Sequence, residues 1–162
     1  MPLLKDGKLI DDPWSHIADE VAIPASGQVI VGLKRWREER DSLIKRKDPA
    51  GVRLQSDHTA GDVADDLEHL GVVALAFPVF KDGRAYSNAR RLRERHGYTG
   101  EIRAIGNVLR DQYLFMLRCG FDALEVKEGE TERDWEKAVR AFSVFYQPAA
   151  DGRVTALSLR HN

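Results

Sequence analysis

Residues 72–105, VVALAFPVFKDGRAYSNARRLRERHGYTGEIRAI, decide the fold because they contain a complete strand–helix–strand unit. The continuously apolar run at 72–77 predicts a strand that is buried on both faces. The basic segment at about 85–96 predicts a helix, and two glycines separate it from a second strand at 101–105. Short strands that alternate with helices are typical of βαβ units in a parallel sheet.

The same alternation continues outward along the chain. It predicts strands at 28–33, 51–55 and 123–126, and helices at 34–47, 60–70, 108–118 and 131–145. The N-terminal stretch LLKDGKLI places an Asp-Gly pair between apolar pairs, which predicts a hairpin, and we interpret the tail VTALSL as an extra strand. We therefore expect an α/β fold of about five mostly parallel strands alternating with helices. The periodicity does not distinguish an open flavodoxin-like sheet from a curved partial barrel.

The bulk properties indicate one globular α/β domain spanning residues 1–162, of which 43% are hydrophobic and 31% are charged. The longest apolar run, 71–80, is about half of the roughly 20 residues that a membrane helix needs. The N-terminus has neither the apolar stretch of a signal peptide nor the acid-poor character of a transit peptide. We expect a cytoplasmic protein with no membrane partner.

Charge and cysteine content exclude several classes of partner and cofactor. The net charge is −1, and no nucleic-acid recognition motif occurs, so we expect no nucleic-acid partner. Cys119 is the only cysteine, which excludes an intrachain disulfide and a multi-cysteine cluster within one chain. The five histidines lack H-x-x-x-H and H-E-x-x-H spacings, so we predict no self-contained metal site. The sequence identifies no cofactor and does not fix the oligomeric state.

The loop at 80–87 is the first candidate site, because ligands collect at the carboxyl ends of parallel strands. Asp82 and Gly83 predict a turn with inward-pointing amides, and Arg84 and Ser87 begin the next helix, where the helix dipole favours an anion. This pattern predicts a site for a sulfate-like, phosphate or carboxylate group. In the alternative interpretation, Asp82 only caps the helix and Arg84 pairs with a nearby carboxylate.

Two neighbouring loops add further candidates. Asn107, Arg110 and Asp111 follow the strand at 101–105, and His58 follows the strand at 51–55. A substrate bound by the arginines and amides would find an acid or base in Asp82, Asp111 or His58. For the loop around His58, the simpler interpretation is that Asp57 or Thr59 caps the next helix.

The basic helix offers a different kind of site. Arg91 and Arg95 lie four residues apart, so they share one side of a helix that carries a single acidic residue between them. This arrangement suits docking of an acidic partner. Alternatively, it is an ordinary solvated face that the acidic segment 62–68 partly neutralises.

The stretch 77–126, FPVFKDGRAYSNARRLRERHGYTGEIRAIGNVLRDQYLFMLRCGFDALEV, resembles a bacterial family known as a domain of unknown function. Its members are commonly encoded beside sulfite reductase genes, and an oxidoreductase role is inferred for them from that neighbourhood. The family pattern has aspartate at the position of Asn107, so a carboxylate role there does not carry over. The resemblance implies an accessory protein of assimilatory sulfite reduction, with sulfite reductase or its electron donor as partner and an oxyanion as ligand. The alternative is an enzyme acting on a phosphorylated or carboxylated small molecule at the carboxyl ends of the strands, and whether the protein is an enzyme stays open.

Overall fold

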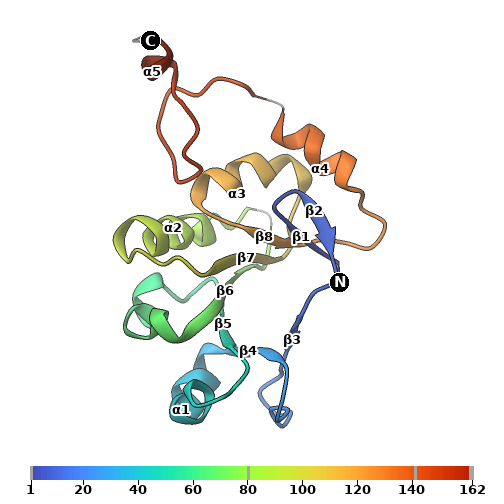
Figure 1. Ribbon diagram of the computed structural model, residues 1–162, viewed down its shortest axis with the longest axis vertical. Helices are drawn as coiled ribbons and strands as arrows, with labels where there is room; N and C mark the ends of the chain where they lie inside the picture. Colours follow the sequence, from blue (N-terminus) through green and yellow to red (C-terminus); the bar gives the residue numbers. More distant parts are fainter. Residues whose placement is uncertain (1, 80, 141, 161–162) are drawn as a thin grey trace.

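Eight strands form one sheet, in the order β2-β1-β8-β7-β6-β5-β4-β3, in the computed structural model, which describes residues 2–79, 81–140 and 142–160 (Figure 1). The strands are β1 (Leu3–Lys5), β2 (Lys8–Ile10), β3 (Trp14–His16), β4 (Gln28–Gly32), β5 (Ala50–Leu54), β6 (Leu70–Phe77), β7 (Glu101–Gly106) and β8 (Ala123–Glu125).

The strands from β3 to β8 are parallel and lie side by side in sequence order. A flavodoxin-like sheet would interrupt that order at a switch point, whereas a barrel-type sheet adds each strand beside the previous one. The hairpin β1–β2 adds two antiparallel strands at the β8 edge, where Leu3 pairs with Glu125. Strand order therefore selects the barrel-like alternative.

The sheet is strongly curled. His16 on β3 and Glu125 on β8 are 2.6 Å apart, although four strands lie between them. In a flat sheet these strands would be separated by five spacings of about 4.8 Å, or roughly 24 Å. Two side chains cannot span that distance, so the concave face must fold toward itself as in a partial barrel.

Helical segments cover the convex face. They are α1 (Leu33–Ile44), the 3₁₀-helix η1 (Ala60–His69), α2 (Arg84–Arg90), the π-helix η2 (Arg91–Arg95), the 3₁₀ turn η3 (Arg110–Gln112), α3 (Tyr113–Cys119) and α4 (Glu132–Val139), whereas the short helix α5 (Ala156–Arg160) has no buried residue and is not part of this cover. The main core joins these segments to alternate strand residues such as Val73, Leu75 and Ile102. The residues between them, such as Val72 and Ala74, form a small second cluster on the concave face.

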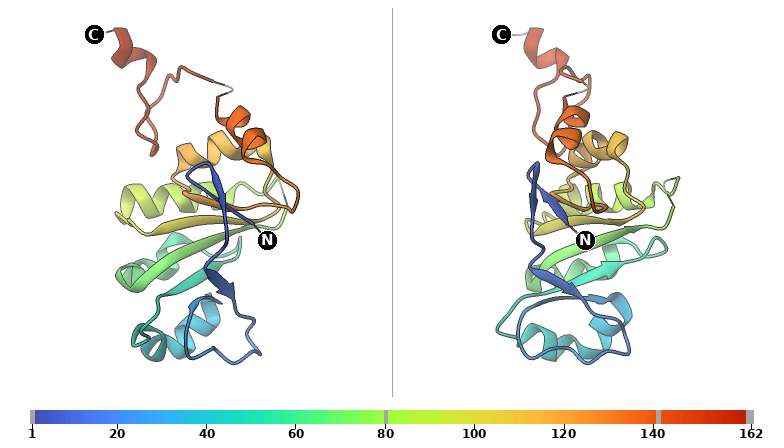
Figure 2. Two further views of the ribbon diagram at one scale, coloured as in Figure 1. Left: turned by 45° about the vertical axis from the view of Figure 1, so that its right-hand side comes forward. Right: turned by 90° about the vertical axis from the view of Figure 1, so that its right-hand side faces the viewer.

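The N-terminal segment covers the concave face. It leaves the hairpin at one edge of the sheet and reaches β3 at the other, along the side away from α2 (Figure 2). Trp14 packs there against the cluster that contains Ile30 and Ala74. The N-terminal segment thus supplies both edges of the sheet and a cover for its inner side.

The five expected strands and the hairpin are confirmed. In the hairpin turn, Asp6 and Gly7 have φ of 50° and 78°, the left-handed pair that an Asp-Gly turn adopts. The three-residue strand β3 was not expected, because a run as short as Trp-Ser-His carries no readable period. The tail was predicted wrongly: Ala156–Arg160 is helical, since Thr155 and Ser158 hydrogen-bond each other's backbone and start a helical turn.

Some helix ends also differ from expectation. The helix expected at 131–145 ends at Val139: Trp135 is buried in the core, whereas Phe142 is exposed, so no core contact extends the helix that far. Gly120 ends α3 with φ of 100°, as its position in the sequence predicts. In the part of the chain that the structure describes, no helix is long and apolar enough to cross a membrane.

Candidate functional site

The loop between β6 and α2 holds the residues expected to bind an anion. Arg84 donates from Nε to Asp82 Oδ1 (2.9 Å) and from Nη2 to Asp82 Oδ2 (2.6 Å), which makes a bidentate ion pair. The Arg84 amide also donates to Asp82 Oδ1 (3.2 Å), and Nη2 donates to Ser56 Oγ (3.0 Å). Asp82 thus satisfies the first amide of α2 and neutralises Arg84, as the capping interpretation describes.

These contacts set the electrostatics of the loop. The hydrogen bonds from Arg84 hold the pKa of Asp82 well below its ordinary value, so the carboxylate is charged at neutral pH. Gly83 has φ of −85°, so its backbone is not in the left-handed region, and Ser87 is exposed on α2. Phe80, at the start of the loop, lies outside the described residues. The anion site stays a prediction, and its ligand would have to replace Asp82 as the partner of Arg84.

The loop after β7 directs its charges elsewhere. Arg110 Nε lies 3.2 Å from Glu130 Oε2, and Nη1 lies 3.4 Å from Asp134 Oδ1. The guanidinium is therefore held toward α4. The backbone N–H of Asn107 donates to the Phe77 carbonyl (2.8 Å), which fixes Asn107 beside the end of β6. Asp111 is exposed and lines an apolar groove beside α3.

His58 lies in a turn that its own ring helps to form. The Gln55 amide donates to His58 Nδ1 (3.0 Å). The following residue, Thr59, exchanges hydrogen bonds with Asp62, so Thr59 rather than Asp57 caps η1. The backbone hydrogen bond from Thr59 lowers the pKa of Asp62 below its ordinary value. The capping interpretation of this loop is confirmed, and one ring nitrogen of His58 is already occupied.

Arg91 and Arg95 are exposed on η2, and neither forms an ion pair within residues 2–79, 81–140 and 142–160. The His96 amide donates to the Arg91 carbonyl (3.0 Å), the five-residue spacing of a π-turn. This turn buries Leu92 completely and directs Arg93 inward. The remaining arginines consequently face solvent.

Arg93 anchors η2 to the sheet. Its Nε donates to the Gly120 carbonyl (3.0 Å), and Nη1 donates to the carbonyls of Tyr98 (2.6 Å) and Gly100 (2.8 Å). Its Nη2 donates to the Asp122 carboxylate. These bonds hold the arginine-rich turn rigidly against the end of α3 and the start of β8.

The acidic segment 62–68 does not neutralise η2 as expected. Asp62 accepts from Arg37 (2.7 Å), and Asp66 accepts from Arg40 (2.6 Å) and from Trp36 Nε1 (2.7 Å). All three donors lie on α1, whose basic face covers η1. This arrangement is invisible in the sequence, because it depends on which helix packs against η1.

A buried charge cluster on the concave face was not anticipated. Arg103 on β7 is completely buried, and its Nη1 lies 2.6 Å from Asp12 Oδ2 and 3.2 Å from Glu125 Oε1. Its Nε donates to Glu101 Oε1 (2.8 Å). Burial alone would lower the pKa of the guanidinium, but hydrogen bonds and attraction to Asp12 and Glu101 raise it above its ordinary value.

Two further pairs extend this cluster. His16 Nε2 lies 2.6 Å from Glu125 Oε1, and Lys5 Nζ donates to Glu101 Oε2 (2.7 Å). Burial would raise the pKa of Glu125, but His16 and Arg103 together lower it. The hydrogen bond to Glu101 likewise raises the pKa of Lys5. We call Lys5, Asp12, His16, Glu101, Arg103 and Glu125 the inner-face cluster.

A cleft of about 600 Å³ opens beside this cluster, lined by Asp11, Asp12, Trp14, His16 and Glu125. No group of three or more His, Cys, Asp or Glu side chains within the described ranges is placed to hold a metal ion. One signal for the cluster exists in the sequence: Glu101 and Arg103 alternate with Ile102 and Ala104, and a period of two directs charges to one face of a strand.

A family model for bacterial proteins of unknown function, DUF934, matches residues 51–157, about two thirds of the chain. The chain belongs to this family. No curated protein matches the sequence.

The DUF934 match begins at Gly51 in β5, so β1 to β4 and α1 precede it. The inner-face cluster crosses that boundary. Three of its residues lie before the DUF934 segment and three lie within it. Two contacts between the two sets are ion pairs, Lys5 with Glu101 and Asp12 with Arg103, and in the third the His16 ring lies against the Glu125 carboxylate. The preceding segment therefore supplies polar and charged partners for buried groups of the DUF934 segment.

Proposed function

We propose that this DUF934 protein is an accessory protein of assimilatory sulfite reduction that docks an acidic partner, the reductase or its electron donor, through Arg91 and Arg95. The observation that carries the docking surface is the exposure of both arginines without an ion pair among the described residues. The pathway comes from the resemblance of residues 77–126 to proteins encoded beside sulfite reductase genes.

The geometry favours docking over catalysis. Arg84, Arg110 and His58 are each engaged by a neighbouring group of the same chain. By contrast, Arg91 and Arg95 lie on a turn whose backbone Arg93 anchors to neighbouring segments, so docking them has to order their side chains but not the backbone. Solvent-facing charges of one sign steer an oppositely charged partner, and this attraction weakens as the salt concentration rises.

A deletion strain tests the pathway. It should grow poorly on sulfate and recover on sulfide or cysteine, because these reduced sulfur sources bypass the reduction of sulfite to sulfide. Normal growth of the deletion strain on every sulfur source would exclude a role in sulfite reduction.

Complementation of that strain tests the docking surface. The double variant Arg91→Glu/Arg95→Glu should fail to restore growth on sulfate, and its capture of the partner should fall on the order of tenfold or more. The matched control is Arg133→Glu/Lys137→Glu, which reverses two exposed charges at the same spacing on α4 that form no ion pair among the described residues. Equal complementation by both double variants would remove η2 as the docking surface.

The alternative proposal is an enzyme acting on a phosphorylated or carboxylated small molecule at the carboxyl ends of the strands. It is favoured by the exposed guanidinium of Arg84, with Ser87 exposed one turn further along α2. Thermal unfolding with sulfate, sulfite, phosphate or nucleotides tests this proposal. Stabilisation that disappears in Arg84→Ala would support it, and no stabilisation by any of these ligands would exclude it.

A further inference from the structure

An apolar groove of about 320 Å³ lies between α3 and the extended segment 142–146. It is lined by Asp111, Leu114, Phe115, Arg118, Phe142, Val144, Phe145 and Tyr146. Asp111, Leu114 and Phe115 are spaced by three and four residues, so they share one side of the helical turn. Asp111 is exposed and has no ion-pair partner among the described residues.

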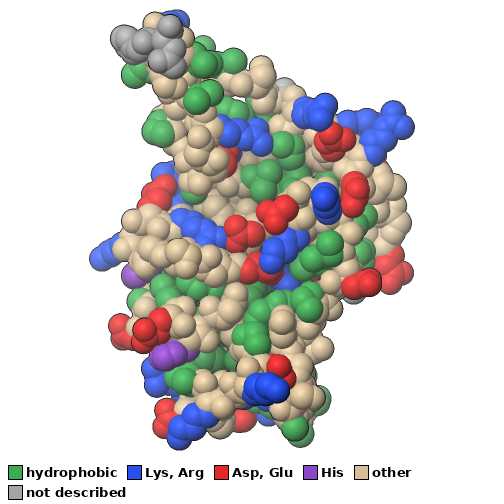
Figure 3. Space-filling model, viewed as in Figure 1, with side chains coloured by type: hydrophobic (Ala, Val, Ile, Leu, Met, Phe, Trp, Pro, Cys, Tyr) green, Lys and Arg blue, Asp and Glu red, His purple; other side chains and the backbone are tan. Residues whose placement is uncertain are grey.

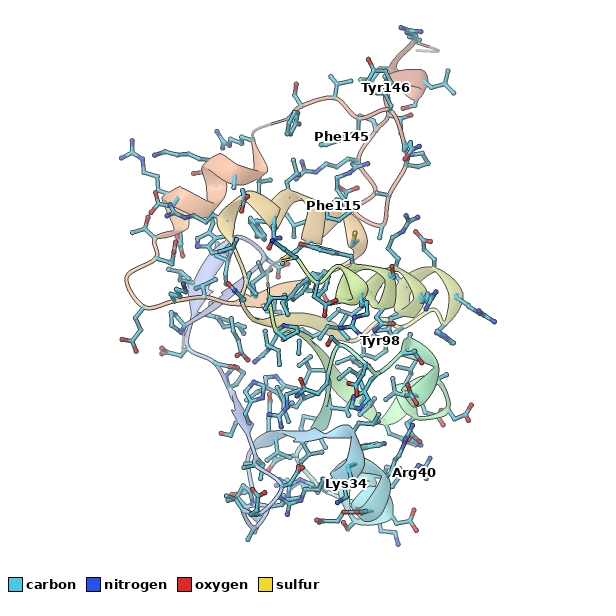
Figure 4. All side chains as sticks on the ribbon, turned by 180° about the vertical axis from the view of Figure 1, so that it is seen from behind. Lys34, Arg40, Tyr98, Phe115, Phe145 and Tyr146 are labelled. Carbon is cyan, nitrogen blue, oxygen red and sulfur yellow. The ribbon has the colours of Figure 1, made fainter. Side chains whose placement is uncertain are left out.

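The segment 142–146 leaves large apolar side chains in solvent. Phe142, Val144 and Tyr146 alternate along the extended chain and are 66%, 52% and 87% exposed. Phe145 lies between Val144 and Tyr146 and packs under the Arg118 guanidinium, whose central carbon is 3.9 Å from the centre of the Phe145 ring. Figure 4 shows Phe115 and Phe145 near each other and Tyr146 further out, and Figure 3 shows hydrophobic side chains over the C-terminal segment. A surface of this kind marks an interaction site.

Helix α5 is carried on the same projecting segment. The Ala156 amide donates to the Phe145 carbonyl (2.6 Å), which fixes the start of α5. From there α5 extends away from the sheet (Figures 1 and 2), and none of its residues lines the groove. Leu157 is 64% exposed, and Arg160 is exposed without an ion pair in the region the structure covers.

We propose that the groove binds α5 from a second copy of this chain, in a reciprocal dimer. Leu157 and Arg160 are three residues apart on one side of α5, and Leu114 and Asp111 are three residues apart on the wall of the groove. If α5 of one copy lies antiparallel to α3 of the other, Leu157 contacts Leu114, and at the same time Arg160 contacts Asp111. One apolar contact and one ion pair therefore form together, because the two residues on each helix have the same spacing.

The occupant is a second copy because the same chain carries both complementary surfaces, the groove and the exposed side of α5. In a two-fold dimer the contact occurs twice, with each groove receiving the partner's helix. In that dimer the groove covers Leu157, and Arg160 pairs with Asp111 of the other copy. The dimer contact is separate from Arg91 and Arg95, so the proposed docking function does not depend on it.

Analytical ultracentrifugation of the full chain tests the dimer. The wild type should sediment as a dimer at micromolar concentrations. Asp111→Arg and Arg160→Glu should each weaken dimerisation on the order of tenfold or more, because each places like charges at both contacts. The controls Asp65→Arg and Arg133→Glu make the same changes at exposed positions that form no ion pair in the part of the chain the structure describes, and they should leave the dimer intact.

Mixing gives a test that a folding defect cannot imitate. In a heterodimer of the Asp111→Arg and Arg160→Glu chains, both contacts again join opposite charges, so the mixture should regain the wild-type dissociation constant. The double variant Asp111→Arg/Arg160→Glu should do the same. A monomeric wild type at about 100 μM, or a dimer that neither single reversal weakens, would overturn the proposal, as would failure of the mixture to recover.

Discussion

Replacing Arg103 with methionine should destabilise the protein strongly, because the guanidinium is the central cation of the inner-face cluster. Arg103 has no exposed surface, and it contacts Asp12, Glu101 and Glu125. Methionine keeps much of the side-chain volume but leaves these carboxylates without their shared partner. The perturbation is therefore electrostatic and creates little cavity.

The magnitude follows from burial. The side chains of Glu101 and Glu125 are only 8% and 9% exposed, so water cannot replace the lost cation fully. Removing one partner of a buried ion pair costs about 3–5 kcal/mol. We expect about 3 kcal/mol, because the neighbouring cleft admits water on one side and Lys5 and His16 remain. For a chain of this size that loss lowers Tm by roughly 6–12 °C.

The pH dependence distinguishes this mechanism from lost packing. In the wild type, the pKa of Glu125 is lowered, so its contribution to stability is present above its unfolded pKa and is lost as pH falls through the folded pKa. In Arg103→Met, Glu125 loses the guanidinium that helps to lower its pKa, so its pKa should rise and its protonation should relieve part of the cost. The stability gap between variant and wild type should therefore narrow as pH falls from 7 toward about 4.

Urea denaturation at several pH values, followed by circular dichroism, measures both effects. A matched control is Arg133→Met, which removes an exposed arginine of α4 that forms no ion pair among the described residues. The control should change the free energy of unfolding by less than about 0.5 kcal/mol. If Arg103→Met loses less than about 1 kcal/mol, or if its deficit is the same at pH 4 and pH 7, the electrostatic reasoning is wrong.

Three further predictions concern the end of α3 and its surroundings. Tyr98→Phe removes a buried hydrogen bond to the Leu70 carbonyl and should cost about 1–2 kcal/mol in urea denaturation, whereas an unchanged midpoint would contradict this role. Gly120→Ala should cost about 1–3 kcal/mol, because φ is 100° and the new methyl group would lie 2.6 Å from Arg93 Cγ; a neutral effect would show that Arg93 yields freely. Burial raises the pKa of the Cys119 thiol to about 11, so iodoacetamide at pH 8 should modify it only as fast as the protein opens, and rapid labelling of the folded protein would refute its burial.

Several features of the site could be predicted from the sequence because they depend on residues close together in the chain. Thr59 was expected as one of two capping residues, and a helix cap is satisfied within three residues of itself. The alternative interpretation of the 80–87 loop expected a nearby carboxylate as the partner of Arg84, and Asp82, two residues away, is that carboxylate. Gly120 was placed correctly because a left-handed helix end requires a residue without a side chain.

Other features depend on contacts between distant segments. The role of Arg93 differs from that of Arg91 and Arg95 only because the π-turn rotates it toward the sheet. The inner-face cluster joins His16 to a strand 109 residues further along the chain. No local pattern distinguishes these residues from ordinary surface charges.

The sequence by itself determined the element types around residues 72–105, since apolar runs and basic amphipathic runs have different periods and different glycine boundaries. It also determined the five core strands and the N-terminal hairpin. Only the tertiary structure decided that the sheet curls, because curvature is the sum of small rotations between paired strands and leaves no mark on any one of them. That curl brings β3 near β8 and buries Arg103 among carboxylates from three separate segments of the chain.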